Sequence, residues 1–107
     1  MTIAEEATSL VEHSLDKGKH VGINEVAERL YTSRSKLCAT FKAQTGESLG
    51  AYIRRRRMER AQDLLADSSL TIAQVAERLG YPQQAAFAQA FKQHTGTTPT
   101  AWRSQHQ

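Results

Sequence analysis

Apolar residues recur every three to four positions along most of this chain, a spacing typical of helices with one buried face. Ile3, Ala7, Val11 and Leu15 form the first such stripe, which ends before Gly18. Further stripes predict helices that begin near residues 23, 33, 48, 71, 83 and 98. No segment alternates apolar and polar residues for long enough to form a strand. The pattern therefore predicts an all-α protein of about seven helices.

Residues that favour helix starts stand at the expected boundaries. Ser33 and Ser48 precede the third and fourth predicted helices, where a hydroxyl can accept a bond from a first-turn N–H. Thr71 and Gln74 have the spacing of a capping box. Pro99 takes the first position of the last helix, where its missing N–H costs nothing. These signals support the helix boundaries that the apolar pattern predicts.

The chain repeats itself. The segment 26–30, Val-Ala-Glu-Arg-Leu, recurs unchanged at 75–79, forty-nine residues later. Phe41 recurs as Phe91 at an offset of fifty, so the second copy has one extra residue in its turn, near Gly80. Because there are only two copies, each must bury its own small core. The repeat predicts two similar lobes.

The fourth predicted helix has two apolar stripes. Leu49 and Ile53 lie on one side, whereas Met58, Ala61 and Leu65 lie on another. A helix that packed on one core would keep one stripe. We therefore expect this helix to connect the lobes. The predicted parts are a first lobe over about 3–48, a connecting helix over about 48–66 and a second lobe over about 67–105.

Positive charge is concentrated in the second half of the 107-residue chain, whose net charge is +3. Residues 51–107 hold eight Lys/Arg against four Asp/Glu, and residues 54–57 are four successive arginines. Such a cluster indicates either a site for a polyanion or a solvated helix face, with similar weight. Successive side chains turn by about 100° around a helix, so the four arginines cannot all reach one ligand.

Several classes of function are disfavoured. No apolar stretch approaches the length of a membrane span, and the first residues lack the features of a signal peptide. The single cysteine, Cys38, fits a reducing compartment, so we expect a cytoplasmic location without membrane contact. The four histidines lack metal-ligand spacing, and no catalytic triad or carboxylate pair is visible. We expect no metal, no cofactor and no enzymatic activity.

Each lobe contains a short helix, a tight turn and a second helix with a polar outer face. This arrangement fits a helix-turn-helix or a plain helical hairpin. A set of spaced residues favours the first: segments 57–65, 71–76 and 90–92, and also Gly80-Tyr81, Phe87, Thr95-Gly96, Pro99 and Trp102-Arg103. Through them, residues 4–103 resemble the DNA-binding domain of the AraC/XylS family of bacterial transcription regulators.

The resemblance implies one DNA-binding domain over 1–107, with two homeodomain-like helix-turn-helix lobes joined by a long helix. Two recognition helices would enter adjacent major-groove segments of double-stranded DNA. The implied function is sequence-specific transcription regulation, as an activator that contacts RNA polymerase. Some family members also carry an N-terminal effector or dimerisation domain. The alternative is a protein-interaction module that kept the fold and lost DNA binding.

The resemblance also assigns candidate DNA-binding residues. In the first recognition helix, 33–42, Leu37 and Phe41 face the core. The residues left for DNA are Ser33, Arg34, Ser35, Lys36, Cys38, Ala39 and Lys42. The candidates in the second helix, 83–93, are Gln83, Gln84, Ala86, Gln89 and Lys92. Arginine and lysine suit guanine or phosphate, and glutamine suits adenine. A lone thiol such as Cys38 is more often inert filler.

Five positions depart from the family pattern or need a second interpretation. Many relatives have arginine at the positions of Ala39 and Gln89 and serine at that of Ala85, so the second lobe's contacts with DNA are expected to be weaker. Tyr31 occupies a turn position that is often glycine; either a positive φ there strains it or the turn is built differently. Arg57 matches a recurrent arginine, for which we expect either a structural ion pair or a DNA contact.

Overall fold

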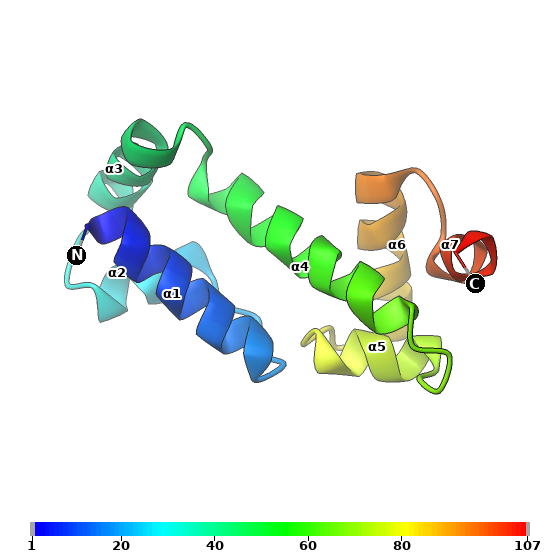
Figure 1. Cartoon of the computed structure of the whole chain (residues 1–107). Helices are drawn as coiled ribbons and strands as arrows, with labels where there is room; N and C mark the ends of the chain where they lie inside the picture. The colour runs from blue at the N-terminus through cyan, green and yellow to red at the C-terminus, as the bar shows by residue number, and fades with distance from the viewer. Residues whose placement is uncertain (1, 107) are drawn as a thin grey trace. The chain divides into compact units, whose positions relative to one another are not determined.

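The computed structural model describes residues 2–106 and contains seven helices in that range, with no strand. They are α1 (Ile3–Asp16), α2 (Ile23–Arg29), α3 (Arg34–Thr45), α4 (Leu49–Leu65), α5 (Ile72–Arg78), α6 (Gln84–Thr95) and α7 (Pro99–Gln105) (Figure 1). The predicted all-α fold is confirmed. α3 contains the candidate residues 34–42 and ends at Thr45, directly before Gly46.

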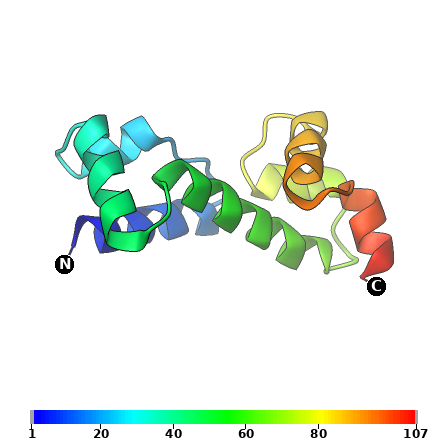
Figure 2. The same ribbon diagram turned by 90° about the horizontal axis from the view of Figure 1, so that it is seen from above.

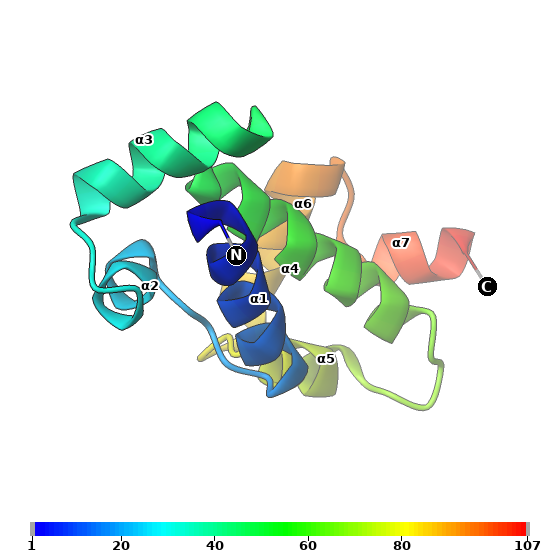
Figure 3. The same ribbon diagram turned by 60° about the vertical axis from the view of Figure 1, so that its left-hand side comes forward.

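The helices form two compact units, and the division falls within α4, between Arg56 and Arg57. The core of the first unit includes Val11, Val26, Leu37, Phe41, Leu49 and Ile53. The core of the second includes Met58, Ala61, Leu65, Val75, Phe87 and Phe91. The two stripes of α4 thus serve two different cores, as the sequence predicted. In the first unit α3 packs against α1 and α2 (Figure 3), and in the second α6 packs against α5 and α7.

The predicted helix caps are present. The Ser33 hydroxyl accepts a bond from the Lys36 amide at 3.1 Å, and Ser48 accepts one from the Ala51 amide at 3.2 Å. Thr71 and Gln74 form the predicted capping box. A second capping box, between Thr2 and Glu5, begins α1 and was not predicted. These local bonds fix where each helix begins and so which side chains its first turn presents.

The duplication extends to the turns that end the recognition helices. The Thr45 hydroxyl donates to the carbonyls of Phe41 at 2.8 Å and Glu47 at 3.0 Å. Fifty residues later, Thr95 makes the same two bonds, to Phe91 at 2.8 Å and Thr97 at 3.0 Å. Left-handed glycines, Gly46 and Gly96, terminate the two helices. The repeated sequence therefore builds a repeated structure.

The tight turns between α2 and α3 and between α5 and α6 also share their hydrogen bonds. Figure 2 shows the ribbon from above. The Thr32 amide donates to the Ala27 carbonyl at 3.0 Å, as the Tyr81 amide does to Ala76. The turn requires a left-handed residue, which is Gly80 in the second unit, with φ of 81°, and Tyr31 in the first, with φ of 55°. The tyrosine thus occupies a backbone conformation that favours glycine.

Candidate nucleic-acid interface

The outward side of α3 carries most of the exposed charge among the candidate residues. Leu37 and Phe41 are buried, which fixes the rotation of the helix about its axis. The exposed candidates on and beside it are Ser33, Arg34, Ser35, Lys36, Ala39 and Lys42, and Cys38 is half-buried. Three of these side chains are cations. The buried pair therefore turns a positively charged surface toward solvent.

Arg34 is partly positioned by its own unit. Its guanidinium donates to the Asn24 side-chain oxygen of α2 at 3.1 Å. Asn24 is neutral and exposed, so this bond orients Arg34 without cancelling its charge, and four of the five guanidinium N–H donors are not used by it. Asn24 was not among the residues predicted to contribute to the site. The equivalent position in the repeat is Ala73, so the second unit has no counterpart of this bond.

The buried residues of α6 stand at the same positions as those of α3, but the side chains on its outward side differ in chemistry. Phe87 and Phe91 are buried, with ring centroids 5.7 Å apart. Exposed residues on this helix include Gln84, Ala85, Ala86, Gln89, Lys92 and Gln93. Only Lys92 among them is charged. The prediction that Gln83 lies inside this recognition helix is wrong. Gln83 is the N-cap residue, with an extended backbone and no capping bond from its side chain.

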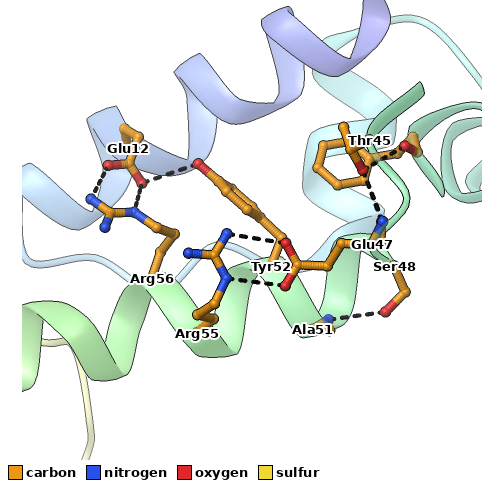
Figure 4. A network of polar contacts seen from close by, with 9 residues as sticks. Glu12, Thr45, Glu47, Ser48, Ala51, Tyr52, Arg55 and Arg56 are labelled. Carbon is orange, nitrogen blue, oxygen red and sulfur yellow. Dashed lines mark hydrogen bonds and ion pairs between the residues drawn. The ribbon is translucent and has the colours of Figure 1, made fainter.

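The arginine cluster is largely engaged within the chain. Arg55 holds Glu47 through two bonds of 3.1 Å, and Arg56 holds Glu12 through bonds of 2.7 and 3.1 Å (Figure 4). Tyr52 completes this network by donating to Glu12 at 3.4 Å. The hydrogen bond from Arg55 is the main reason that the pKa of Glu47 is lowered. As the helical geometry predicted, neighbouring arginines reach different partners.

Arg57 has a structural role, but the prediction that this role is an ion pair is wrong. Its guanidinium donates to the Leu79 carbonyl through two bonds, of 2.9 and 3.1 Å. The same group lies 3.7 Å from the centroid of the Tyr81 ring, a cation–π contact. Burial lowers the pKa of Arg57 and raises that of Tyr81. Arg57 therefore binds the end of α5, where helical carbonyls lack intrahelical donors.

A second arginine of this kind is Arg103 on α7. It donates to the Leu65 carbonyl at the end of α4 at 2.9 Å, and to the Asp67 carbonyl at 3.4 Å. Arg103 belongs to the family pattern, but this role was not predicted. No sequence signal identifies a main-chain acceptor, because any carbonyl at a helix end can serve.

Within residues 2–106, no group of three or more His, Cys, Asp or Glu side chains has the arrangement needed to hold a metal ion. Over the same residues, none of the helices combines the length and apolarity of a membrane span. The exposed polar surfaces of α3 and α6 are the candidates for a binding site that the sequence predicted.

Comparison with known proteins decides the family. A model of the helix-turn-helix domain family matches residues 26–105. The chain is 36% identical over 90 residues to the Msm operon regulatory protein of Streptococcus mutans, covering 84% of this chain and 32% of that protein. The C-terminal domain of AraT, a response regulator from Geobacillus stearothermophilus, superposes with a TM-score of 0.89 at 30% identity. That match covers 98% of this chain and 86% of the other. The chain belongs to the AraC-type helix-turn-helix family.

AraC-type domains include one whose structure contains DNA. The DNA-binding domain of AdpA, a global transcriptional factor, was solved in complex with a target DNA. It superposes on this chain with a TM-score of 0.82 at 27% identity, over 97% of this chain and 91% of the other. The predicted resemblance to this family is thus confirmed. The chain spans only 22% to 34% of the length of the first curated relatives it matches.

Proposed function

We propose that this AraC-type chain binds double-stranded DNA sequence-specifically to regulate transcription, with α3 and α6 each entering a major groove. The observation that carries the proposal is the outward side of α3. Lys36 and Lys42 project from the side of the helix away from buried Leu37 and Phe41, and Arg34 is exposed in its first turn. A rigid helix with exposed cations can enter the groove and bind phosphates and base edges together.

The proposal extends to the setting in which the chain acts. The relatives' names describe operon regulators and a transcriptional activator, which supports activation through contact with RNA polymerase. Bacterial transcription places such a protein in the cytoplasm. The relatives' greater length supports a further domain in the whole protein, of the effector or dimerisation type. Within the chain, the candidates Ser33, Ser35, Cys38, Ala39 and Ala86 complete the proposed DNA surface.

The two units should contribute unequally to affinity. α3 offers three cations and α6 offers one, and charge-assisted bonds to phosphate or guanine are stronger than those of neutral amides. We therefore expect Arg34→Ala or Lys36→Ala to weaken specific binding more than Gln84→Ala or Gln89→Ala. For a base-reading residue the loss should be about 1–3 kcal/mol.

The experiment is a set of binding isotherms on a duplex selected from a random library, at several salt concentrations. The logarithm of affinity should fall with the logarithm of salt concentration, and a lost phosphate contact should reduce that slope by about 0.9. Lys19→Ala, an exposed lysine outside both recognition helices, is the matched control and should change little. Salt-independent or absent duplex binding would instead support a protein-interaction module.

A further inference from the structure

The outward side of α6 is a neutral surface of amides and methyl groups. Each position on it corresponds to a position of α3 fifty residues earlier. Ala85 stands at the position of Ser35, and Ala86 stands at that of Lys36. Gln89 stands where α3 has Ala39. The exposed lysine is the only charge that the two surfaces share at an equivalent position, as Lys42 and Lys92. The two units therefore present different chemistry from the same scaffold.

The glutamine amides on this surface are available to a ligand. Gln84, Gln89 and Gln93 are exposed, and within residues 2–106 none of their side chains is held by another residue. A glutamine amide presents one donor and one acceptor side by side, which complements N6 and N7 of adenine in the major groove. Guanine offers two acceptors there, O6 and N7, so the amide oxygen finds no donor and the paired bonds made with adenine are lost.

The alanines add a second preference of the same kind. Ala85 and Ala86 place two exposed methyl groups next to the glutamines, and their small size lets the helix approach the base edges closely. Alanine contacts the 5-methyl group of thymine, which no other base carries. Adenine and thymine form one base pair, so amides and methyl groups on one surface favour the same sequence class.

We infer that α6 is a reader of A·T base pairs, with Gln84 and Gln89 bonding adenine and Ala85 and Ala86 contacting thymine methyl groups. This inference rests on the proposed DNA-binding function and names the sequence class of one half of the site. Lys92 binds phosphate and adds affinity without sequence preference. The second unit therefore supplies selectivity and little electrostatic affinity.

The test begins with selection of duplexes from a random library by the 107-residue chain. An A·T-rich element should be enriched, and Gln89→Ala and Gln84→Ala should change the preference within that element alone. Replacing one of its A·T pairs with G·C should weaken binding of the unaltered chain roughly 5- to 100-fold. Lys92→Ala is the matched control, since it should weaken binding to both duplexes equally. Circular dichroism checks that each variant is folded.

Base analogues then test the two contacts separately. Replacing adenine by 7-deazaadenine removes the N7 acceptor, and replacing thymine by deoxyuridine removes the methyl group. At the adenine bonded by one glutamine, the first replacement should weaken binding of the unaltered chain but not binding of the variant that lacks that glutamine, Gln84→Ala or Gln89→Ala. Deoxyuridine should reduce the affinity of the unaltered chain more than it reduces the affinity of the Ala85→Gly or Ala86→Gly variant.

The outcomes separate the inference from the proposed function. If the chain selects duplexes but the α6 variants keep the same base preference, the inference is wrong and the proposed function stands. The inference also fails if the element governed by α6 is G·C-rich. If no duplex is retained in a salt-dependent manner, both the inference and the proposed function fail.

Discussion

Tyr31 is an exposed aromatic residue held in a backbone conformation that favours glycine. Its φ is 55° and its side chain is 97% exposed, whereas Gly80 takes the same place in the second unit with φ of 81°. The hydrogen bonds around the two positions are equivalent. Replacing Tyr31 by glycine should therefore relieve backbone strain while removing almost no packing.

The size of the effect follows from two opposing terms. The left-handed conformation costs a residue with a Cβ about 1–2 kcal/mol. Glycine also gives the unfolded chain more freedom, which offsets about 0.4–1 kcal/mol of that gain. The difference between the middle values of the two ranges is a net stabilisation of about 0.8 kcal/mol for Tyr31→Gly. Gly80→Ala should have the opposite sign, because it introduces a Cβ where φ is positive.

Urea unfolding can assign each effect to its own unit. Trp102, the single tryptophan, packs against the core of the second unit, so its fluorescence reports that unit. Circular dichroism at 222 nm reports both. With a slope of about 1–3 kcal/mol per molar urea, Tyr31→Gly should raise the first unit's midpoint by roughly 0.2–1 M. Gly80→Ala should lower the midpoint seen by fluorescence.

Tyr31→Ala separates backbone strain from side-chain effects, because alanine keeps the Cβ and loses the ring. We expect it to be less stable than Tyr31→Gly. If alanine stabilises as much as glycine, backbone strain is not the cause and the ring itself is the destabilising group. If Tyr31→Gly lowers the midpoint, the turn is not strained.

Three further changes test the second unit. Phe91→Ala should destabilise it by about 3–5 kcal/mol, because the ring is fully buried; a small shift of the urea midpoint would contradict the core assignment. Arg57→Lys should lose one of two bonds to the Leu79 carbonyl and the stacking on Tyr81, at about 1–2 kcal/mol; an unchanged midpoint would show that Arg57 is not structural. Burial raises the pKa of Tyr81 in the folded chain above 10.0, the value of an unperturbed tyrosine. The stability that the neutral phenol contributes is therefore fully present below pH 10.0 and is lost as the pH rises through the pKa of the folded state. Alkaline unfolding followed by Trp102 fluorescence should therefore lose part of its pH dependence in Tyr81→Phe, and an identical profile would refute this.

The helices were predictable because their signals are local. Apolar spacing, a hydroxyl at the N-cap and a glycine after the last turn each act within a few residues, as at Ser33 and Gly46. The duplication supplied the rest, since the two units share their turn bonds. Gln83 was misplaced because a helix start without a capping side chain has no local signal, and glutamine is a good helix former.

The partners of the arginines could not be predicted in the same way. Arg55 reaches Glu47 eight residues away, whereas Arg57 reaches Leu79 over 22 residues and Arg56 reaches Glu12 over 44. A long side chain with five donors can choose among many acceptors, and the choice depends on how the helices pack. The sequence predicted strain at Tyr31 only on the condition that its φ is positive, because the residue type is known from the sequence and the φ is not.

These partners also change what the charge of the chain means. The second half of the sequence is the basic half, but Arg55 and Arg56 are paired with carboxylates, and Arg57 bonds a carbonyl within its unit. A paired arginine adds little field at the distance of a phosphate, because its carboxylate cancels most of it. The cations of α3 lie in the half of the chain whose net charge is negative, yet they are the ones turned to solvent. DNA affinity should therefore follow the charge of α3, whereas a count of basic residues in each half of the sequence points to the half that does not contain α3.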